Sequence, residues 1–362
     1  MAEMEELAAT RGFLDHDIYT DHAGRIYFVL GHYQPEDRVI SLLKYTPDET
    51  GTWIHRVTGT KYSRSYQHEG IDAFVSAEIV EKSEQNTDIG SWLMDDPVFG
   101  TEFLEMPKTE IDEYMRPEER MEGILESGDG DLDDMERLVK KIVVAVMQNA
   151  RMTDLVAEDV GITGSILWRG YSDRSDINLN VYGLDNCKSL EQKLGLLAIR
   201  HVMLARGLTV EMKGFDDVPS ITTGEGVKRA ELRRKPKLKL EGFKPGIQVR
   251  WCLRKGEFPL TYGSEKYKEK GMATLKVKVI DDTFTLFYPA MIQVETLEGT
   301  PAIDRVMIYD TRFVRLLRNG DVVEITGLLQ GITGKRKNQL LIGSKAHAAE
   351  ERVVFLETGG RN

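Results

Sequence analysis

The stretch Gly161-Ile-Thr-Gly-Ser-Ile-Leu-Trp-Arg-Gly-Tyr-Ser-Asp-Arg-Ser-Asp-Ile-Asn-Leu-Asn-Val-Tyr-Gly183 is the most informative part of the chain. An apolar run ends at Gly164 and Ser165, and an alternating run begins at Asp176. In the second run, polar positions 176, 178 and 180 fall on one face of a strand, and the apolar positions between them fall on the other. The pattern predicts a strand, a glycine turn, a short helix, a loop and a second strand.

This order of elements suits the binding of a nucleoside triphosphate. Backbone N–H groups at the start of a helix can hold phosphates, and glycine lets the backbone approach them closely. Carboxylates two residues apart on a strand point to the same side and can share a pair of divalent metals. Two metals can then activate an attacking hydroxyl and stabilise a leaving pyrophosphate.

The motif, with Gly164-Ser165 followed by Asp176-Ile-Asn178, resembles the nucleotidyltransferase superfamily that includes DNA polymerase beta. Residues 25–47, residues 114–120 and the β-rich C-terminal part also resemble uncharacterised archaeal proteins with a nucleotidyltransferase domain. The resemblance implies an enzyme that binds a nucleoside triphosphate with Mg²⁺ or Mn²⁺ and transfers a nucleotidyl group to an unknown acceptor.

The resemblance also implies roles for single residues. It places Gly164 and Ser165 on the triphosphate and makes Asp176 the first metal carboxylate. Asn178 stands where the superfamily carries its second carboxylate, so a metal pair would lose one negative charge. Glu211, on a predicted strand at 208–212, is one candidate for the third carboxylate.

Arg174 lies in the loop between the turn and the second strand, where it either contacts phosphate or is a solvated loop residue. The later strand predicted at 247–253 offers Gln248, Arg250 and Cys252, none of which is acidic.

Other interpretations stay open. Gly164-Ser165 can be an ordinary turn, and Asn178 can be a polar residue with no catalytic role. The missing carboxylate motivates a second functional hypothesis, in which a catalytically degenerate domain acts as a nucleotide sensor or as an RNA- or DNA-binding module. A third hypothesis is a scaffold whose acidic N-terminal unit binds a basic partner.

Length and charge indicate several domains. The 362 residues exceed one typical core, so we expect two or three domains. The net charge is −11, but residues 1–130 hold 11 Lys and Arg against 28 Asp and Glu, a balance of −17. Two cysteines, an acidic N-terminus and the lack of a long apolar run favour a cytoplasmic protein that does not span a membrane.

The predicted fold class is α+β with three domains. An acidic α+β domain covers residues 1–127, and its end, residues 112–125, is predicted to be helical. A nucleotidyltransferase-like α/β domain with a basic linker covers residues 128–245. A β-rich domain, predicted to be an OB-like barrel because of its short strands and turns, covers residues 246–362.

Two further clusters have alternative explanations. The linker contains Arg233, Arg234 and Lys235, which either contact RNA or DNA or form a solvated face. His16, His22 and His32 lie near three aspartates at positions 15, 17 and 21. A metal site there is conceivable, but the spacing matches no standard ligand pattern and favours a solvated turn.

Overall fold

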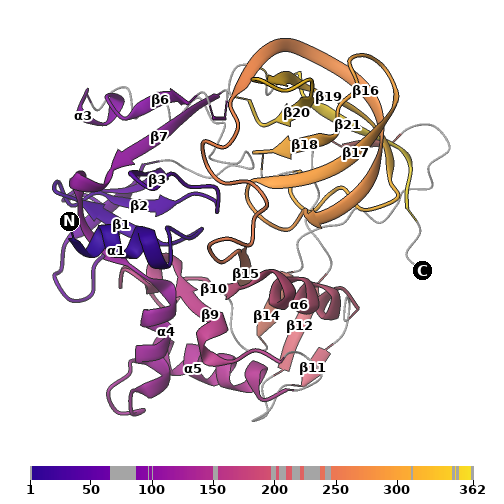
Figure 1. The fold of residues 1–362 in the computed structure, drawn as a ribbon. Helices are drawn as coiled ribbons and strands as arrows, with labels where there is room; N and C mark the ends of the chain where they lie inside the picture. Colours follow the sequence, from indigo (N-terminus) through magenta and orange to yellow (C-terminus); the bar gives the residue numbers. More distant parts are fainter. Residues whose placement is uncertain are drawn as a thin grey trace.

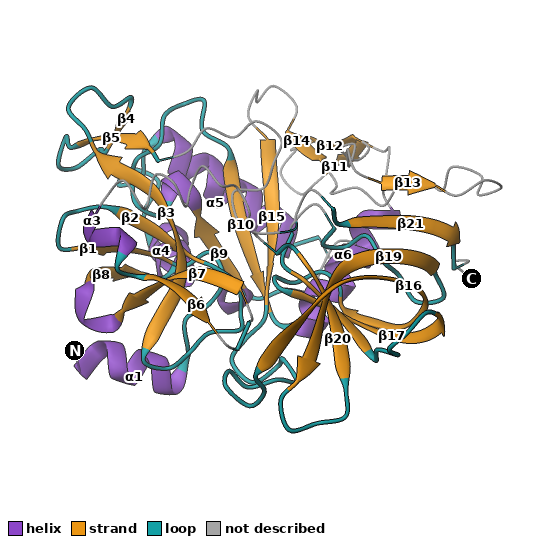
Figure 2. Cartoon of the chain, turned by 90° about the horizontal axis from the view of Figure 1, so that it is seen from above, coloured by secondary structure: helices purple, strands orange, loops and turns teal. Residues whose placement is uncertain are grey.

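The computed structural model describes residues 2–65, 87–96, 98–99, 101–149, 154–196, 201–203, 209–213, 221–223, 237–240, 246–310, 313–344, 347 and 350–359. Arg233, Arg234 and Lys235 lie outside the described residues. The described chain is a mixed α+β protein with three sheets (Figure 1). The central sheet lies between the other two (Figure 2).

The N-terminal sheet is antiparallel and has the order β4-β5-β3-β2-β1-β8, with β7 on β3 and β6 on β7. One of its faces packs against α1 (Ala2–Thr10) through Met4, Leu7 and Ala8. The other elements are β1 (Ile18–Asp21), β2 (Ile26–Val29), β3 (Arg38–Pro47), β4 (Trp53–Ile54), β5 (Lys61–Arg64), α3 (Thr87–Gly90), β6 (Leu93–Asp96), β7 (Thr101–Pro107), η1 (Lys108–Glu110) and β8 (Ile111–Met115).

The central sheet is mixed and has the order β11-β12-β14-β15-β10-β9. Strand β10 is antiparallel to β9 and parallel to β15. The strands of the central sheet and the helices that accompany it are α4 (Pro117–Glu126), α5 (Asp134–Met147), η2 (Ala157–Asp159), β9 (Val160–Thr163), η3 (Gly164–Ile166), β10 (Ile177–Tyr182), α6 (Leu184–Leu196), β11 (His201–Met203), β12 (Thr209–Lys213), β14 (Lys237–Leu240) and β15 (Gly246–Cys252).

The C-terminal sheet has the order β13-β21-β19-β16-β17-β18-β20. Because β20 also pairs with β19, the strands β19, β16, β17, β18 and β20 form a closed ring of pairings. The elements are β13 (Ile221–Thr223), β16 (Tyr267–Phe284), β17 (Ala290–Glu298), β18 (Arg305–Ile308), β19 (Val322–Ile332), β20 (Asn338–Ile342) and β21 (Arg352–Glu357).

Several elements join a sheet or core that belongs to a neighbouring part of the predicted domain division; we call the three sheets with their helices the N-terminal, central and C-terminal units. Residues 112–125 are not one helix: strand β8 is followed by α4, which begins at Pro117. Helix α4 buries Met121 and Ile124 in the core of the central unit. Strand β15 joins the central sheet, and β13 joins the C-terminal sheet. Such pairings join residues far apart in sequence, so local composition does not reveal them.

Two further local features stand out. Asp133 caps α5 and forms a capping box with Glu136. Asp281 and Asp282 lie inside the long strand β16. Within the described residues, no helix is both long and apolar enough to cross a membrane.

Candidate functional site

Strand β10 divides its side chains between two faces, as the alternation predicts. Ile177, Leu179 and Val181 pack in the core with α4, α5 and α6. Asp176, Asn178 and Asn180 therefore lie on the opposite face, which we call the polar face of the central sheet. The register pairs Asn178 with Thr163 on β9 and with Gln248 on β15.

Gly164 makes the turn after β9 in a way that requires glycine. Its φ is +69°, and a Cβ atom there would lie 2.9 Å from Nδ2 of Asn178. The turn therefore sits directly against the Asn178 side chain. This contact joins the two halves of the sequence motif.

The short helix expected after Gly164 is a single 3₁₀ turn, η3. All three of its residues are buried, and Ser165 is 8% exposed. Trp168 then packs between the units against Tyr45 and Tyr62. Arg174 is exposed on the loop before β10. So short a turn does not form the helix N-terminus that would hold a triphosphate.

Asp176 is already engaged by the protein. Its Oδ1 atom accepts a hydrogen bond from the Gly246 N–H at 2.8 Å, and Oδ2 accepts one from Gln248 Nε2 at 3.3 Å. These contacts fasten β10 to the start of β15. The neighbours of Asp176 on the polar face are Asn178 and Gln248, both neutral.

The strand that carries Glu211 is not next to the strand that follows Asp176. Glu211 lies on β12 and pairs with Lys239 on β14, so β14 and β15 separate it from β10. Three strand spacings amount to about 14 Å, which is too far for two ligands of one metal. Among the described residues, no group of three or more His, Cys, Asp or Glu side chains is placed to hold a metal. Within the part of the chain that the structure describes, the polar face therefore does not fit the metal pair that the sequence resemblance implies.

The turn at Asp15 and His16 covers part of the polar face. The Thr163 hydroxyl donates to the His16 carbonyl at 2.6 Å. Asn180 Nδ2 and the Cys252 thiol both donate to the Asp15 carbonyl, at 3.4 Å and 3.3 Å. The N-terminal unit thus forms one wall of a site whose floor is the central sheet.

The prediction of a solvated turn around these aspartates was wrong. Asp15, Asp17 and Asp21 are 4%, 0% and 2% exposed. Their carboxylates bind neighbouring groups: Asp15 accepts from the Gly31 N–H at 2.7 Å, and Asp17 pairs with Arg11. Of the three histidines, only His22 has a largely exposed side chain.

His16 is held in an unusual conformation at the edge of this wall. Its φ is +66°, a region that costs a non-glycine residue conformational energy. Its Nδ1 atom lies 2.9 Å from Oδ2 of Asp15. Burial lowers the pKa of His16 against the opposing effect of Asp15, and the positive charges of Arg250 and Lys44 lower it further. Burial therefore favours the neutral form of His16.

Lys44 reaches the site from a β-bulge. Ile26 pairs with Tyr45 and Tyr27 pairs with Leu43, which leaves Lys44 as the extra residue on β3. Its Nζ lies over the Phe28 ring, 4.0 Å from the centroid. Burial, followed by the charges of Arg250 and Arg64, lowers the pKa of Lys44 to about 7.

Arg250 lies on β15, opposite Asn180 of β10, and reaches the same place from the central sheet. Its Nη2 donates to Gln248 Oε1 at 2.7 Å, but its Nε is buried and has no hydrogen-bond partner among the residues that the structure describes. We call Lys44, Arg64 and Arg250 the cation site. Among the described residues, no carboxylate lies within ion-pair distance of any of the three. Neighbouring cations without counter-charges can bind an anion, and phosphate suits such a site.

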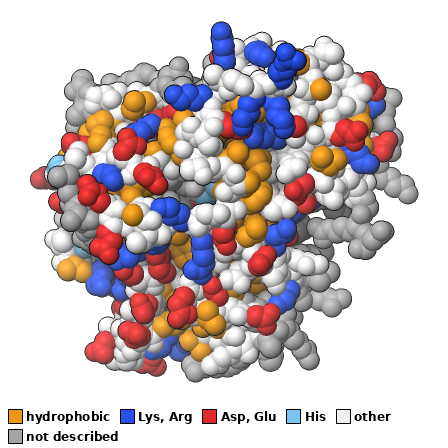
Figure 3. Space-filling view, viewed as in Figure 1, with side chains coloured by type: hydrophobic (Ala, Val, Ile, Leu, Met, Phe, Trp, Pro, Cys, Tyr) orange, Lys and Arg blue, Asp and Glu red, His pale blue; other side chains and the backbone are white. Residues whose placement is uncertain are grey.

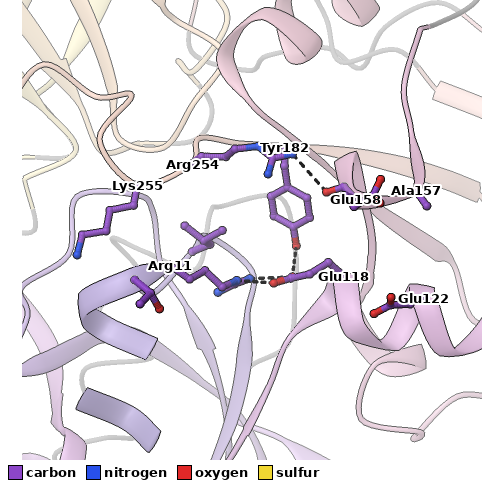
Figure 4. A pocket seen from close by; sticks show the side chains of 10 residues that line it. Arg11, Glu118, Glu122, Ala157, Glu158, Tyr182, Arg254 and Lys255 are labelled. Atoms are coloured by element: carbon purple, nitrogen blue, oxygen red, sulfur yellow. Dashed lines mark hydrogen bonds and ion pairs between the residues drawn. The ribbon is translucent and has the colours of Figure 1, made fainter. Parts of the chain in front are cut away.

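A separate cavity of about 420 Å³ is lined by the residues that follow α1, by α4 and η2, by the end of β10 and by the residues after β15 (Figure 4). Arg11 binds Glu118, which also accepts from the Tyr182 hydroxyl at 3.2 Å. Arg254 contacts the Glu158 carbonyl at 3.3 Å. These groups satisfy one another and join α1, α4 and β10, so the cavity is a structural junction.

No protein-family model, curated protein or solved structure matches the chain. The cation site itself was missed from the sequence. Its two inner members were visible there only as cations within largely apolar stretches, Lys44 in residues 39–45 and Arg250 in residues 247–253. Only the packing of the N-terminal sheet on the central sheet brings them together.

Proposed function

We propose that the protein binds a nucleotide, most simply a nucleoside triphosphate, through its phosphates at the cation site, and that it does not catalyse two-metal nucleotidyl transfer. The observation that carries the proposal is that Arg250 lies near enough to Lys44 for its charge to lower the Lys44 pKa. Among the described residues neither has a carboxylate partner, and the one carboxylate beside them, Asp176, is already engaged. A cationic site attracts phosphate and repels divalent metal.

The sequence resemblance supports a nucleotide as the ligand. The glycine turn and the polar strand keep the order found in nucleotidyltransferases, although Asn178 stands where the superfamily carries a carboxylate, and Gln248 and Arg250 on the neighbouring strand are not acidic. The closed ring of pairings in the C-terminal sheet further supports an OB-like barrel, a fold that often accompanies nucleotide or nucleic-acid binding. On this proposal, the Lys44 and Arg250 side chains supply the positive charge that Mg²⁺ supplies in a transferase.

The test is a calorimetric titration of the protein with ATP in the presence of EDTA. We expect binding without metal, and we expect Arg250→Gln and Lys44→Gln each to weaken it by about tenfold, the effect of losing one charge-assisted contact. Lys141→Gln is the matched control, because Lys141 is exposed on α5 away from the site. Thermal unfolding of each variant shows whether its fold is intact.

Two results would overturn the proposal. One is binding that appears only with Mg²⁺ or Mn²⁺ and is unaffected by both variants. The other is metal-dependent release of pyrophosphate that is lost in Asp176→Asn, which would establish the transferase activity instead.

A further inference from the structure

A group of cations crosses one end of the C-terminal sheet, away from the cation site. The two segments that carry it are adjacent: Lys268 pairs with Gly331, and the Thr333 N–H donates to the Lys266 carbonyl at 2.8 Å. Lys and Arg side chains gather over this sheet near the top of the space-filling view (Figure 3). The exposed members are Lys266, Lys268, Lys270, Lys335, Arg336 and Lys337.

Only some of these charges are neutralised. Lys335 pairs with Glu265 at 2.5 Å, and Lys337 pairs with Asp304 at 2.7 Å. Among the described residues, none of the other four cations has a carboxylate partner. We call Lys266, Lys268, Lys270 and Arg336 the basic row. It is an uncompensated positive surface on a chain whose net charge is −11.

Lys268 and Lys270 are alternate residues of β16, and Lys266 immediately precedes the strand at the next alternate position, so we expect the three lysines of the basic row to share a face. Gly331 lies opposite Lys268, and a Cβ atom there would be 2.5 Å from Cε of Lys270. The missing side chain lets Lys270 lie across the strand towards Asn338, whose Oδ1 it reaches at 2.8 Å. Alternate residues along a strand are about 6.7 Å apart, a spacing similar to that of successive phosphates in an extended polynucleotide.

We propose that the basic row binds the sugar–phosphate backbone of single-stranded nucleic acid. The charges and their spacing fit a chain of phosphates. An anionic membrane surface fits less well, because none of the large hydrophobic side chains exposed among the described residues lies in the row, and interfacial binding normally needs apolar contacts as well. Contacts made by lysine and arginine to phosphates alone give binding that is independent of sequence and sensitive to salt.

The experiment measures fluorescence anisotropy of a labelled, unstructured RNA at several salt concentrations. The same sequence as DNA, its duplex, and phosphatidylserine vesicles form separate arms. We expect RNA, DNA or both to bind as single strands, with an affinity that falls as salt rises. The triple variant Lys266→Glu, Lys268→Glu and Arg336→Glu should weaken binding by about tenfold or more and lower the salt slope by about two.

A matched triple variant separates a local effect from a change in total charge. Lys141→Glu, Lys188→Glu and Lys278→Glu change three exposed lysines elsewhere by the same total charge. We expect this control to keep most of the oligonucleotide affinity and the full salt slope. ATP binding at the cation site should survive in both triple variants, so the two proposals fail or succeed separately.

Three results would overturn the inference. The first is an equal loss of affinity in the two triple variants. The second is oligonucleotide binding that does not change with salt. The third is binding to the vesicles without binding to either single strand, which would assign the basic row to a membrane surface.

Discussion

At the scale of single residues, the cation site and the adjoining His16 have features that are unfavourable for folding. Lys44 is the extra residue of a bulge, His16 has a φ of +66°, and the Nε of Arg250 is buried with no hydrogen-bond partner among the described residues. Each of these features costs folding free energy. Residues of this kind cluster at functional sites, where binding rather than stability has selected them.

Lys44 makes nucleotide binding depend on pH. The site lowers its pKa from the ordinary 10.5 to about 7, so the side chain loses its charge as the pH rises above neutrality. ATP affinity in EDTA should therefore fall between about pH 6 and pH 9. Lys44→Arg should bind ATP with little change over this range, because arginine stays protonated. Calorimetric titrations at several pH values check this, and an equally steep fall in the variant would exclude Lys44 as the cause.

The same pKa shift has a consequence for stability. Lys44 binds its proton more tightly in the unfolded chain, where its pKa is the ordinary 10.5, than in the folded protein, where its pKa is about 7. Burying the charged lysine therefore opposes folding most strongly below about pH 7, where Lys44 is charged in both states. Its unfavourable contribution shrinks as the pH rises from about 7 towards 10.5.

Lys44→Met should therefore raise the free energy of unfolding near pH 7 by about 1 kcal/mol, while ATP binding weakens. The gain should be smaller at higher pH. Chemical denaturation at two pH values measures it, with Lys141→Met as the control. Destabilisation by Lys44→Met at both pH values would contradict this account of the lysine.

At the scale of elements, the sequence predicted the strand β10, the glycine turn and the polar face correctly, because these follow from local alternation and from glycine chemistry. The strand β15 was also predicted, but its place was not. The register that puts Gln248 and Arg250 beside β10 joins residues about seventy positions apart, and no local pattern encodes it. The same limit explains why Glu211 was a reasonable candidate before its strand was placed.

Gly164→Ala tests the turn. The φ of +69° and the approach of Asn178 to within 2.9 Å of a Cβ both oppose a side chain there. We expect the free energy of unfolding to fall by about 1–2 kcal/mol. Gly123→Ala on α4 is the matched control, because a Cβ there meets nothing within 4 Å and alanine favours a helix. Denaturation curves should separate the two variants, and equal stability would mean that the turn tolerates a side chain.

Asp176→Asn tests whether this carboxylate is structural. The substitution removes the charge that strengthens the hydrogen bonds from Gly246 and Gln248. We expect the free energy of unfolding to fall by about 1–2 kcal/mol. ATP binding in EDTA should persist, because a negative charge near the phosphates is removed. Loss of ATP binding in a folded Asp176→Asn protein would instead place Asp176 in the ligand site.

At the scale of the whole molecule, we propose that the ligand binds between the N-terminal and central units rather than within one of them. The sequence predicted a mixed α+β protein, and that coarse prediction is confirmed. It did not predict that the Asp15 turn would lie on the polar face of the central sheet, because this contact joins residues 165 positions apart. The N-terminal unit is strongly acidic overall, yet it contributes Lys44 and Arg64 to the cation site.

The most direct test of the central claim is a crystal structure with a non-hydrolysable ATP analogue, determined once in EDTA and once with Mg²⁺. The account predicts the same pose in both, with phosphate oxygens within hydrogen-bond distance of Lys44 and Arg250 and no metal on Asp176. A triphosphate seated on Gly164 and Ser165, with a metal bound by Asp176 and Asn178, would contradict it.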